Sequence, residues 1–134
     1  MTALLKPALY REEGAPPEPD RPALLGGACA CGYVFFPLQR YGCEKCGGLD
    51  IAPRALAGAG RLLASARVHL HAGKGREAPF TIAAVALDDG PVVRTLVVEG
   101  APPLAPGQRM VTVLTPVSDP EGEPRLDLCF APRA

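Results

Sequence analysis

Four of the five cysteines lie close together in the first half of the 134-residue chain and form two pairs. The first pair is Cys29-Ala30-Cys31, the second is Cys43-Glu44-Lys45-Cys46, and a glycine follows each pair. Two cysteines separated by one or two residues can turn both sulfurs toward one centre, and the glycine lets backbone N–H groups approach the thiolates. Four thiolates select tetrahedral zinc first and iron second. The pattern predicts a metal site with Cys29, Cys31, Cys43 and Cys46 as ligands.

The predicted ion is structural zinc, because four protein ligands leave no position open for water or substrate. Such a site contributes folding free energy to a module that is too small to hold itself together. The first pair is one residue shorter than the common Cys-x-x-Cys spacing, which predicts a tighter geometry and weaker metal binding. Two local disulfides, or reduced cysteines without a metal, are the alternatives that the spacing leaves open.

The remaining candidate side chains give weaker signals. Cys129 lies in the apolar run Leu126–Phe130 without a neighbouring base, so we expect a buried strand cysteine. His69 and His71 would share one face of a strand, and we expect a partner-facing or solvated edge there rather than a metal or acid/base site. The sequence shows no Ser-His-Asp order and no nucleotide-binding glycine motif. We therefore expect no catalytic residue in this chain.

Charge is balanced over the chain, at 14 Lys+Arg against 14 Asp+Glu, but not along it. Residues 51–80 carry five Lys+Arg against one Glu, whereas residues 81–134 carry four Arg against seven Asp+Glu. The segment His71–Arg76 could receive a phosphate, because its glycines free backbone N–H groups and Lys74 and Arg76 supply charge. A solvated loop is the alternative. The zero net charge argues against nucleic acid or a membrane surface as partner.

Three zones of composition indicate the elements that position these groups. Residues 1–25 are rich in proline and charge and predict an extended arm that lies on another surface. Residues 26–50 hold the cysteine pairs and predict a small zinc ribbon. Residues 51–134 contain five β-rich runs, which predict a five-stranded barrel of the oligonucleotide/oligosaccharide-binding (OB) type. The runs are Arg61–His71, Phe80–Leu87, Val92–Val98, Arg109–Val117 and Leu126–Phe130.

We expect a mainly β protein with little helix, since 15 glycines and 16 prolines make long helices improbable. Pro53–Ala59 is the segment that we expect to form a short helical turn. Asp88-Asp89-Gly90-Pro91 predicts a hairpin between the second and third barrel strands. No apolar stretch has the length of a signal-peptide core or of a membrane span of roughly 20 residues, and we expect a soluble, cytoplasmic protein.

A cysteine-rich ribbon followed by an OB barrel resembles the DUF35 family of acyl-CoA-associated zinc-ribbon/OB-fold proteins, whose ribbon is rubredoxin-like. The resemblance covers residues 23–132. The chain departs from the family in its short first cysteine pair and in its proline-rich arm, which stands where many members carry an N-terminal helix. The matching segments are Leu24–Gly27, Cys31–Pro37, Cys43–Gly47, Gly58–Ser65, Pro79–Gly90 and Phe130–Pro132.

The resemblance implies a non-catalytic accessory subunit in a hetero-oligomer with a thiolase-like enzyme, or in some relatives with a hydratase or a thiolase-derived aldolase. The partner would supply the catalytic residues for acyl-CoA carbon–carbon bond cleavage or formation in lipid, sterol or aromatic degradation. In this picture Lys74 and Arg76 contact the phosphates of CoA or acyl-CoA, which is shared with the partner. Phe35, Phe36 and Pro37, together with the arm, contribute to the interface between the subunits.

Two other classes of protein contain similar modules. A single-stranded nucleic-acid-binding protein is disfavoured by the zero net charge and by aromatic residues that are concentrated in the ribbon, whereas bases would stack on barrel strands. A rubredoxin-like electron carrier requires iron at the four clustered cysteines, and its colour would distinguish it from a zinc protein.

Overall fold

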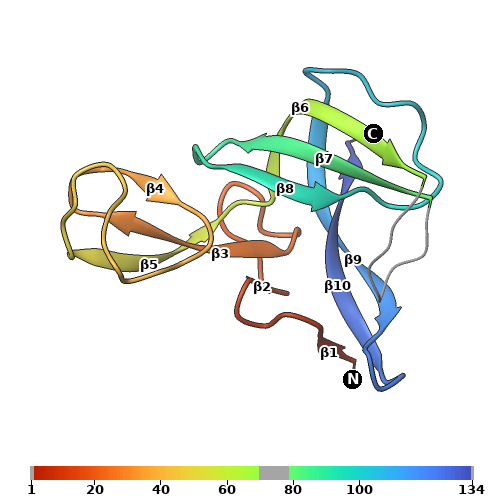
Figure 1. Cartoon of the computed structure of the whole chain (residues 1–134), viewed down its shortest axis with the longest axis horizontal. Helices are drawn as coiled ribbons and strands as arrows, with labels where there is room; N and C mark the ends of the chain where they lie inside the picture. Colours follow the sequence, from red (N-terminus) through yellow and green to blue (C-terminus); the bar gives the residue numbers. More distant parts are fainter. Residues whose placement is uncertain (1, 70–78, 134) are drawn as a thin grey trace.

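The computed structural model describes residues 2–69 and 79–133, which form ten strands in two sheets (Figure 1). The described residues contain no helix, as the abundance of glycine and proline predicts, and so none that could cross a membrane. The strands are β1 (Ala3–Leu4), β2 (Tyr10–Arg11), β3 (Ala23–Cys29), β4 (Val34–Phe35), β5 (Ile51–Leu56), β6 (Ala59–Val68), β7 (Phe80–Leu87), β8 (Val92–Leu96), β9 (Arg109–Ser118) and β10 (Pro124–Pro132).

The larger sheet forms the barrel and has the strand order β1-β10-β9-β6-β7-β8. Its neighbouring strands are antiparallel except for β1 and β10. Beyond β8, a parallel bridge between Val97 and Phe130 joins this end of the sheet back to β10. The five predicted barrel strands are confirmed as β6–β10, and the predicted hairpin joins β7 to β8 with Gly90 at a φ of 120°. The chain therefore adopts a mainly β architecture with an OB-type barrel.

The smaller sheet holds the cysteine pairs. Its central strand, β3, pairs with β2, β4 and β5. The predicted helical turn at Pro53–Ala59 is wrong, because Ile51–Leu56 forms β5 and pairs with β3 along its whole length. Proline lacks an N–H group and is tolerated at an edge, and β5 has a sheet partner on one side only. Pairing with a distant strand thus overrides the local turn signal of Pro53.

The proline-rich arm lies on the chain itself. β1 pairs with β10, with Ala3 opposite Arg125, and β2 pairs with β3, with Tyr10 opposite Leu24. The division of the chain at residues 25 and 50 stays a prediction from composition. The hydrogen-bonded sheet that carries the cysteines also includes β2 from the first zone and β5 from the third.

One hydrophobic core joins the two sheets. Leu56 and Phe130 are fully buried and belong to the same cluster as Tyr10 and Leu24. The other buried members are Leu62, Ala83, Val85, Leu87, Val93, Val97, Met110 and Leu128. Because arm, ribbon and barrel side chains pack together, burial of apolar area stabilises the three zones jointly.

Candidate metal centre

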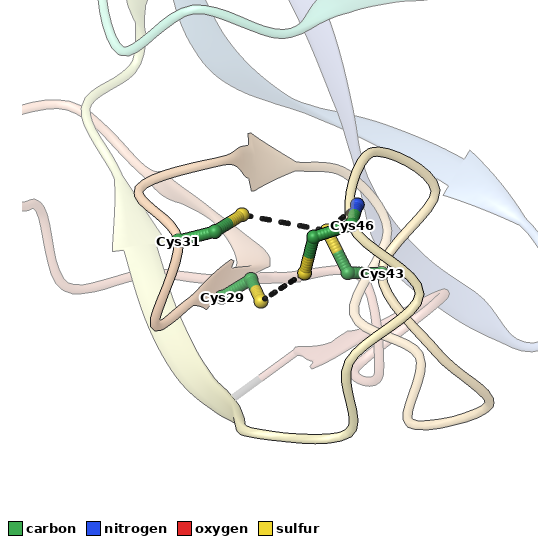
Figure 2. Close-up of side chains that lie close together, drawn as sticks. All are labelled: Cys29, Cys31, Cys43 and Cys46. Carbon is green, nitrogen blue, oxygen red and sulfur yellow. Dashed lines mark hydrogen bonds between the residues drawn. The ribbon is translucent and has the colours of Figure 1, made fainter.

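The four clustered cysteines come from three neighbouring segments of the ribbon. Cys29 ends β3, Cys31 lies in the turn that leads to β4, and Cys43 and Cys46 lie in the loop between β4 and β5. Figure 2 shows their side chains pointing toward one another. All four Sγ atoms lie within 4.8 Å of one another, with 3.5 Å between Cys29 and Cys46 and 3.7 Å between Cys31 and Cys43.

These distances fit one tetrahedral ion. A zinc ion with zinc–sulfur distances of about 2.3 Å has sulfur–sulfur edges of about 3.8 Å, whereas a disulfide holds its sulfurs about 2.0 Å apart. The short sulfur contacts, Cys29 with Cys46 and Cys31 with Cys43, each join one cysteine pair to the other. Local disulfides within each pair are therefore not the arrangement that the fold adopts, and the cluster could hold a metal ion.

Backbone N–H groups of the second cysteine pair point at its sulfurs. The N–H groups of Lys45 and Cys46 donate to Cys43 Sγ at 3.4 and 3.5 Å, and the N–H of Gly48 donates to Cys46 Sγ at 3.3 Å. Gly47 has a φ of 76°, which glycine adopts without the strain that a Cβ would cause. Gly47, which follows the second pair, thus provides the turn. Gly48 provides the N–H donor to Cys46, and the sequence pattern did not single out this residue.

The pKa values of Cys43 and Cys29 are shifted in opposite directions. The backbone N–H of Cys46, followed by that of Lys45, lowers the pKa of Cys43 to about 7 against the opposing effect of burial. The backbone of Cys31 also lowers the pKa of Cys29, but burial and the sulfur contacts with its neighbours outweigh this and raise it to about 12. Of these two thiols, Cys43 is the one that becomes a thiolate, the form that binds metal, near neutral pH.

Comparison with known proteins identifies a family model and a solved structure that are similar to this chain. Residues 53–115 match the family model described as the C-terminal OB-fold domain of ChsH2. A solved structure described as the Ltp2-ChsH2(DUF35) aldolase has a TM-score of 0.65 and 27% sequence identity, over 82% of this chain and 84% of that chain. None of the curated protein sequences matches.

The chain is similar to DUF35-type OB-fold proteins. The family match lies in the barrel, whereas the structural similarity covers most of the chain. The four-cysteine cluster has the arrangement of a zinc ribbon.

Three candidate side chains lie outside the described residues, namely His71, Lys74 and Arg76, so their roles stay predictions. His69 follows the end of β6 and is exposed. Cys129 is buried in β10, and its Sγ lies 3.4 Å from the hydroxyl of Thr115. The prediction of a buried strand cysteine is confirmed.

The predicted interface residues Phe35, Phe36 and Pro37 occupy three different environments in the fold. Phe35 is 4% exposed and stacks on Tyr33 with ring centroids 5.9 Å apart. Phe36 is half-buried and packs against the core, and Pro37 is exposed. Phe36 and Pro37 are therefore the members of this segment that a partner can reach, and their interface role stays a prediction.

Tyr10 is a residue that the sequence reasoning missed. Its hydroxyl donates to Asp127 Oδ1 at 2.8 Å and accepts the N–H of Lys6 at 3.1 Å. Both Tyr10 and Asp127 are buried, so this contact fixes the arm to β10. The available signal was the presence of one aromatic residue in an arm otherwise rich in proline and charge.

Proposed function

We propose that this protein is a zinc-binding accessory subunit that assembles with a catalytic subunit of the thiolase or aldolase type and supports acyl-CoA carbon–carbon bond chemistry. The observation that carries the proposal is the combination of a four-cysteine cluster with a fold similar to the Ltp2-ChsH2(DUF35) aldolase over 82% of the chain. That description names two proteins in one aldolase. We infer that this chain likewise works beside a partner that supplies the reacting groups.

Zinc would act on the ribbon and not on a substrate. Cys29, Cys31, Cys43 and Cys46 would hold it and complete its tetrahedral coordination, which leaves no site for a reacting molecule. The ion would cross-link the end of β3 to the loop between β4 and β5, where Tyr41 and Leu49 are exposed. This cross-link contributes folding free energy to a segment that buries little apolar surface of its own.

The barrel surface gives less support to nucleic-acid binding. Phe80 and Phe130 are the aromatic residues of the segment 51–134, and they are 7% and 0% exposed. Bases that bind OB barrels without sequence preference stack on exposed aromatic rings. The accessory-subunit proposal needs no such rings.

Two finer parts of the proposal rest on the sequence. We propose that Lys74 and Arg76 contact the phosphates of CoA, which a titration of the Lys74→Ala/Arg76→Ala variant with CoA would test. We also place the assembly in the cytoplasm, where acyl-CoA is used and cysteines stay reduced for metal binding.

Copurification tests the proposal directly. The chain, carrying an affinity tag, is coexpressed with the protein of the same genome that is most similar to Ltp2, here called the Ltp2-type protein. The eluted proteins are separated by size. We expect one complex that contains both chains and zinc. Elution of the tagged chain alone, with the Ltp2-type protein folded and active by itself, would contradict the proposal.

A matched pair of variants then tests the contact surface. Phe36→Ala removes a half-buried ring of the predicted interface, and Leu63→Ala removes an apolar side chain that is 37% exposed on β6. We expect Phe36→Ala to reduce the yield of the complex and Leu63→Ala to leave it unchanged. Equal yields for both variants and the wild type would remove Phe36 from the interface.

A further inference from the structure

A groove of about 400 Å³ lies between the arm, the ribbon and the open end of the barrel. Apart from Asp127 and the hydroxyl of Tyr10, its buried lining is apolar and includes Leu24, Leu128 and Phe130, and half-buried Phe36 completes one wall. Lys6 and Arg94 line it from exposed positions. This volume falls at the lower end of the range for binding pockets, and the mixture of an apolar floor with a few polar groups is typical of them.

One wall of the groove is a strand edge that is mostly unpaired among the described residues. β8 is the last strand of its sheet, next to β7 (Figure 1). Four residues of β8 line the groove. The N–H of Leu87 donates to Pro91 O at 2.9 Å, and the N–H of Val97 donates to Thr81 O at 3.0 Å. Because hydrogen-bonded pairs alternate along antiparallel strands, the backbone groups of Val92, Arg94 and Leu96 point away from β7.

The edge stays open because β8 and β10 separate. They meet at the bridge between Val97 and Phe130, where the N–H of Val98 donates to Phe130 O at 3.0 Å. Away from this point the arm enters, and Tyr10 bonds to Asp127 on β10. Among the described residues no strand pairs with the outer edge of β8 at Val92 and Arg94, whereas Leu96 lies next to the bridge to β10 and its carbonyl also contacts the hydroxyl of Thr95 at 3.3 Å.

The charge at the groove is positive. Lys6 and Arg94 form no ion pair with any carboxylate in the described part of the chain. The one acidic residue in the lining, Asp127, is 5% exposed and already accepts from Tyr10 and from its neighbour Leu128. A ligand that carries a carboxylate is therefore favoured over a neutral or cationic one.

We propose that this groove binds an extended segment of a partner protein, which adds as a strand to the edge of β8 and places an acidic side chain at Arg94 and Lys6. Strand addition satisfies the backbone groups of the edge, and alternate apolar side chains fill the groove. A second copy of this chain is a poorer occupant. Antiparallel pairing of two β8 edges through the three outward residues would centre on Arg94 and oppose two arginines.

This docking mode goes beyond the proposed function, because it concerns how a peptide segment of a partner binds and not which reaction the partner catalyses. A phage-displayed library of random heptapeptides is selected on the immobilised, zinc-loaded chain, and the enriched peptides are synthesised. We expect alternating apolar residues with an Asp or Glu. Absence of enrichment, or enrichment without these features, would overturn the inference and leave the copurification test of the proposed function intact.

The binding mode has its own readouts. Bound peptide should slow hydrogen exchange at the amides of Arg94 and Leu96, because these amides become hydrogen-bonded. Peptide that is N-methylated at its edge-facing amides should bind about tenfold more weakly, since it loses donors but keeps its side chains. If hydrogen exchange at these amides were unchanged and the methylated peptide bound with full affinity, the peptide would bind through its side chains alone, which would contradict strand addition.

Charge is tested by a matched pair of variants. Arg94→Glu should weaken the acidic peptide about tenfold and favour a Lys-containing analogue, whereas Arg61→Glu reverses an exposed arginine on β6 outside the groove and should change neither affinity. Thermal unfolding of both variants verifies that they fold. Equal effects of the two variants on peptide affinity would contradict the assignment of a partner strand. Concentration-dependent dimerisation of the chain that competes with the peptide would contradict it as well.

Discussion

Removal of the Tyr10 hydroxyl should destabilise the whole chain, although Tyr10 lies in the arm. The hydroxyl donates to Asp127 Oδ1 at 2.8 Å, and both side chains are at most 5% exposed. In Tyr10→Phe the ring still fills its place in the core, but the buried carboxyl group loses this donor. Hydrogen bonds to charged groups contribute about 1.5–3 kcal/mol, so we expect a loss of about 2 kcal/mol in the free energy of unfolding.

The measurement is urea unfolding of the zinc-loaded chain, followed by circular dichroism because the sequence has no tryptophan. Burial, and then the hydrogen bond to Asp127, raise the pKa of Tyr10 to about 12 from its ordinary value of 10.0. A raised pKa in the folded state means that the contribution is complete below pH 10 and is lost as the pH rises toward 12. The difference between wild type and Tyr10→Phe should therefore be constant near neutral pH and shrink above pH 10.

Tyr33→Phe is the matched control, since the Tyr33 ring stacks on Phe35 and its hydroxyl has no hydrogen bond among the described residues. We expect this variant to change the free energy of unfolding by less than about 0.5 kcal/mol. If Tyr10→Phe were no more destabilising than Tyr33→Phe, the anchoring role of the hydroxyl would be refuted.

Three further predictions concern the metal centre. Cys31→Ser should lose the zinc that the wild type and Cys129→Ser retain, and equal zinc contents by atomic emission would contradict the assignment of ligands. Acid should release zinc as the pH falls, because protons compete with the ion for the four thiolates; occupancy independent of pH, measured with a chromogenic chelator, would contradict this. Gly47→Ala should lower the free energy of unfolding by about 1 kcal/mol and weaken zinc binding in a chelator competition assay, because the φ of 76° strains a residue with a Cβ. Gly47→Asn should be less affected, because asparagine tolerates this conformation better. Equal zinc affinities of Gly47→Ala and the wild type would contradict the prediction.

The sequence predicts the barrel well because its signals are local. Apolar and β-branched runs bounded by Gly, Pro and Asp mark each barrel strand, and Phe80–Leu87 appears with the predicted bounds. The cysteine cluster is similarly local, since each pair lies within one turn. Types and spacing of a few residues were enough to predict both features.

Other features depend on contacts between distant residues and give no local signal. The strand β5 contains Pro53 and Arg54 and becomes a strand only because β3 pairs with it. Gly58 allows a close approach, because a Cβ there would lie 2.0 Å from Thr112 Oγ1, whose hydroxyl donates to Pro22 O at 2.7 Å. The groove beside β8 likewise exists only once arm, ribbon and barrel have packed together.

Native mass spectrometry of the chain coexpressed with the Ltp2-type protein tests the central claim most directly, because it weighs the assembly and its metal together. The account predicts one hetero-oligomeric mass that contains both chains and about one zinc ion for each copy of this chain. Separate masses for the two proteins, or a complex without zinc, would contradict it.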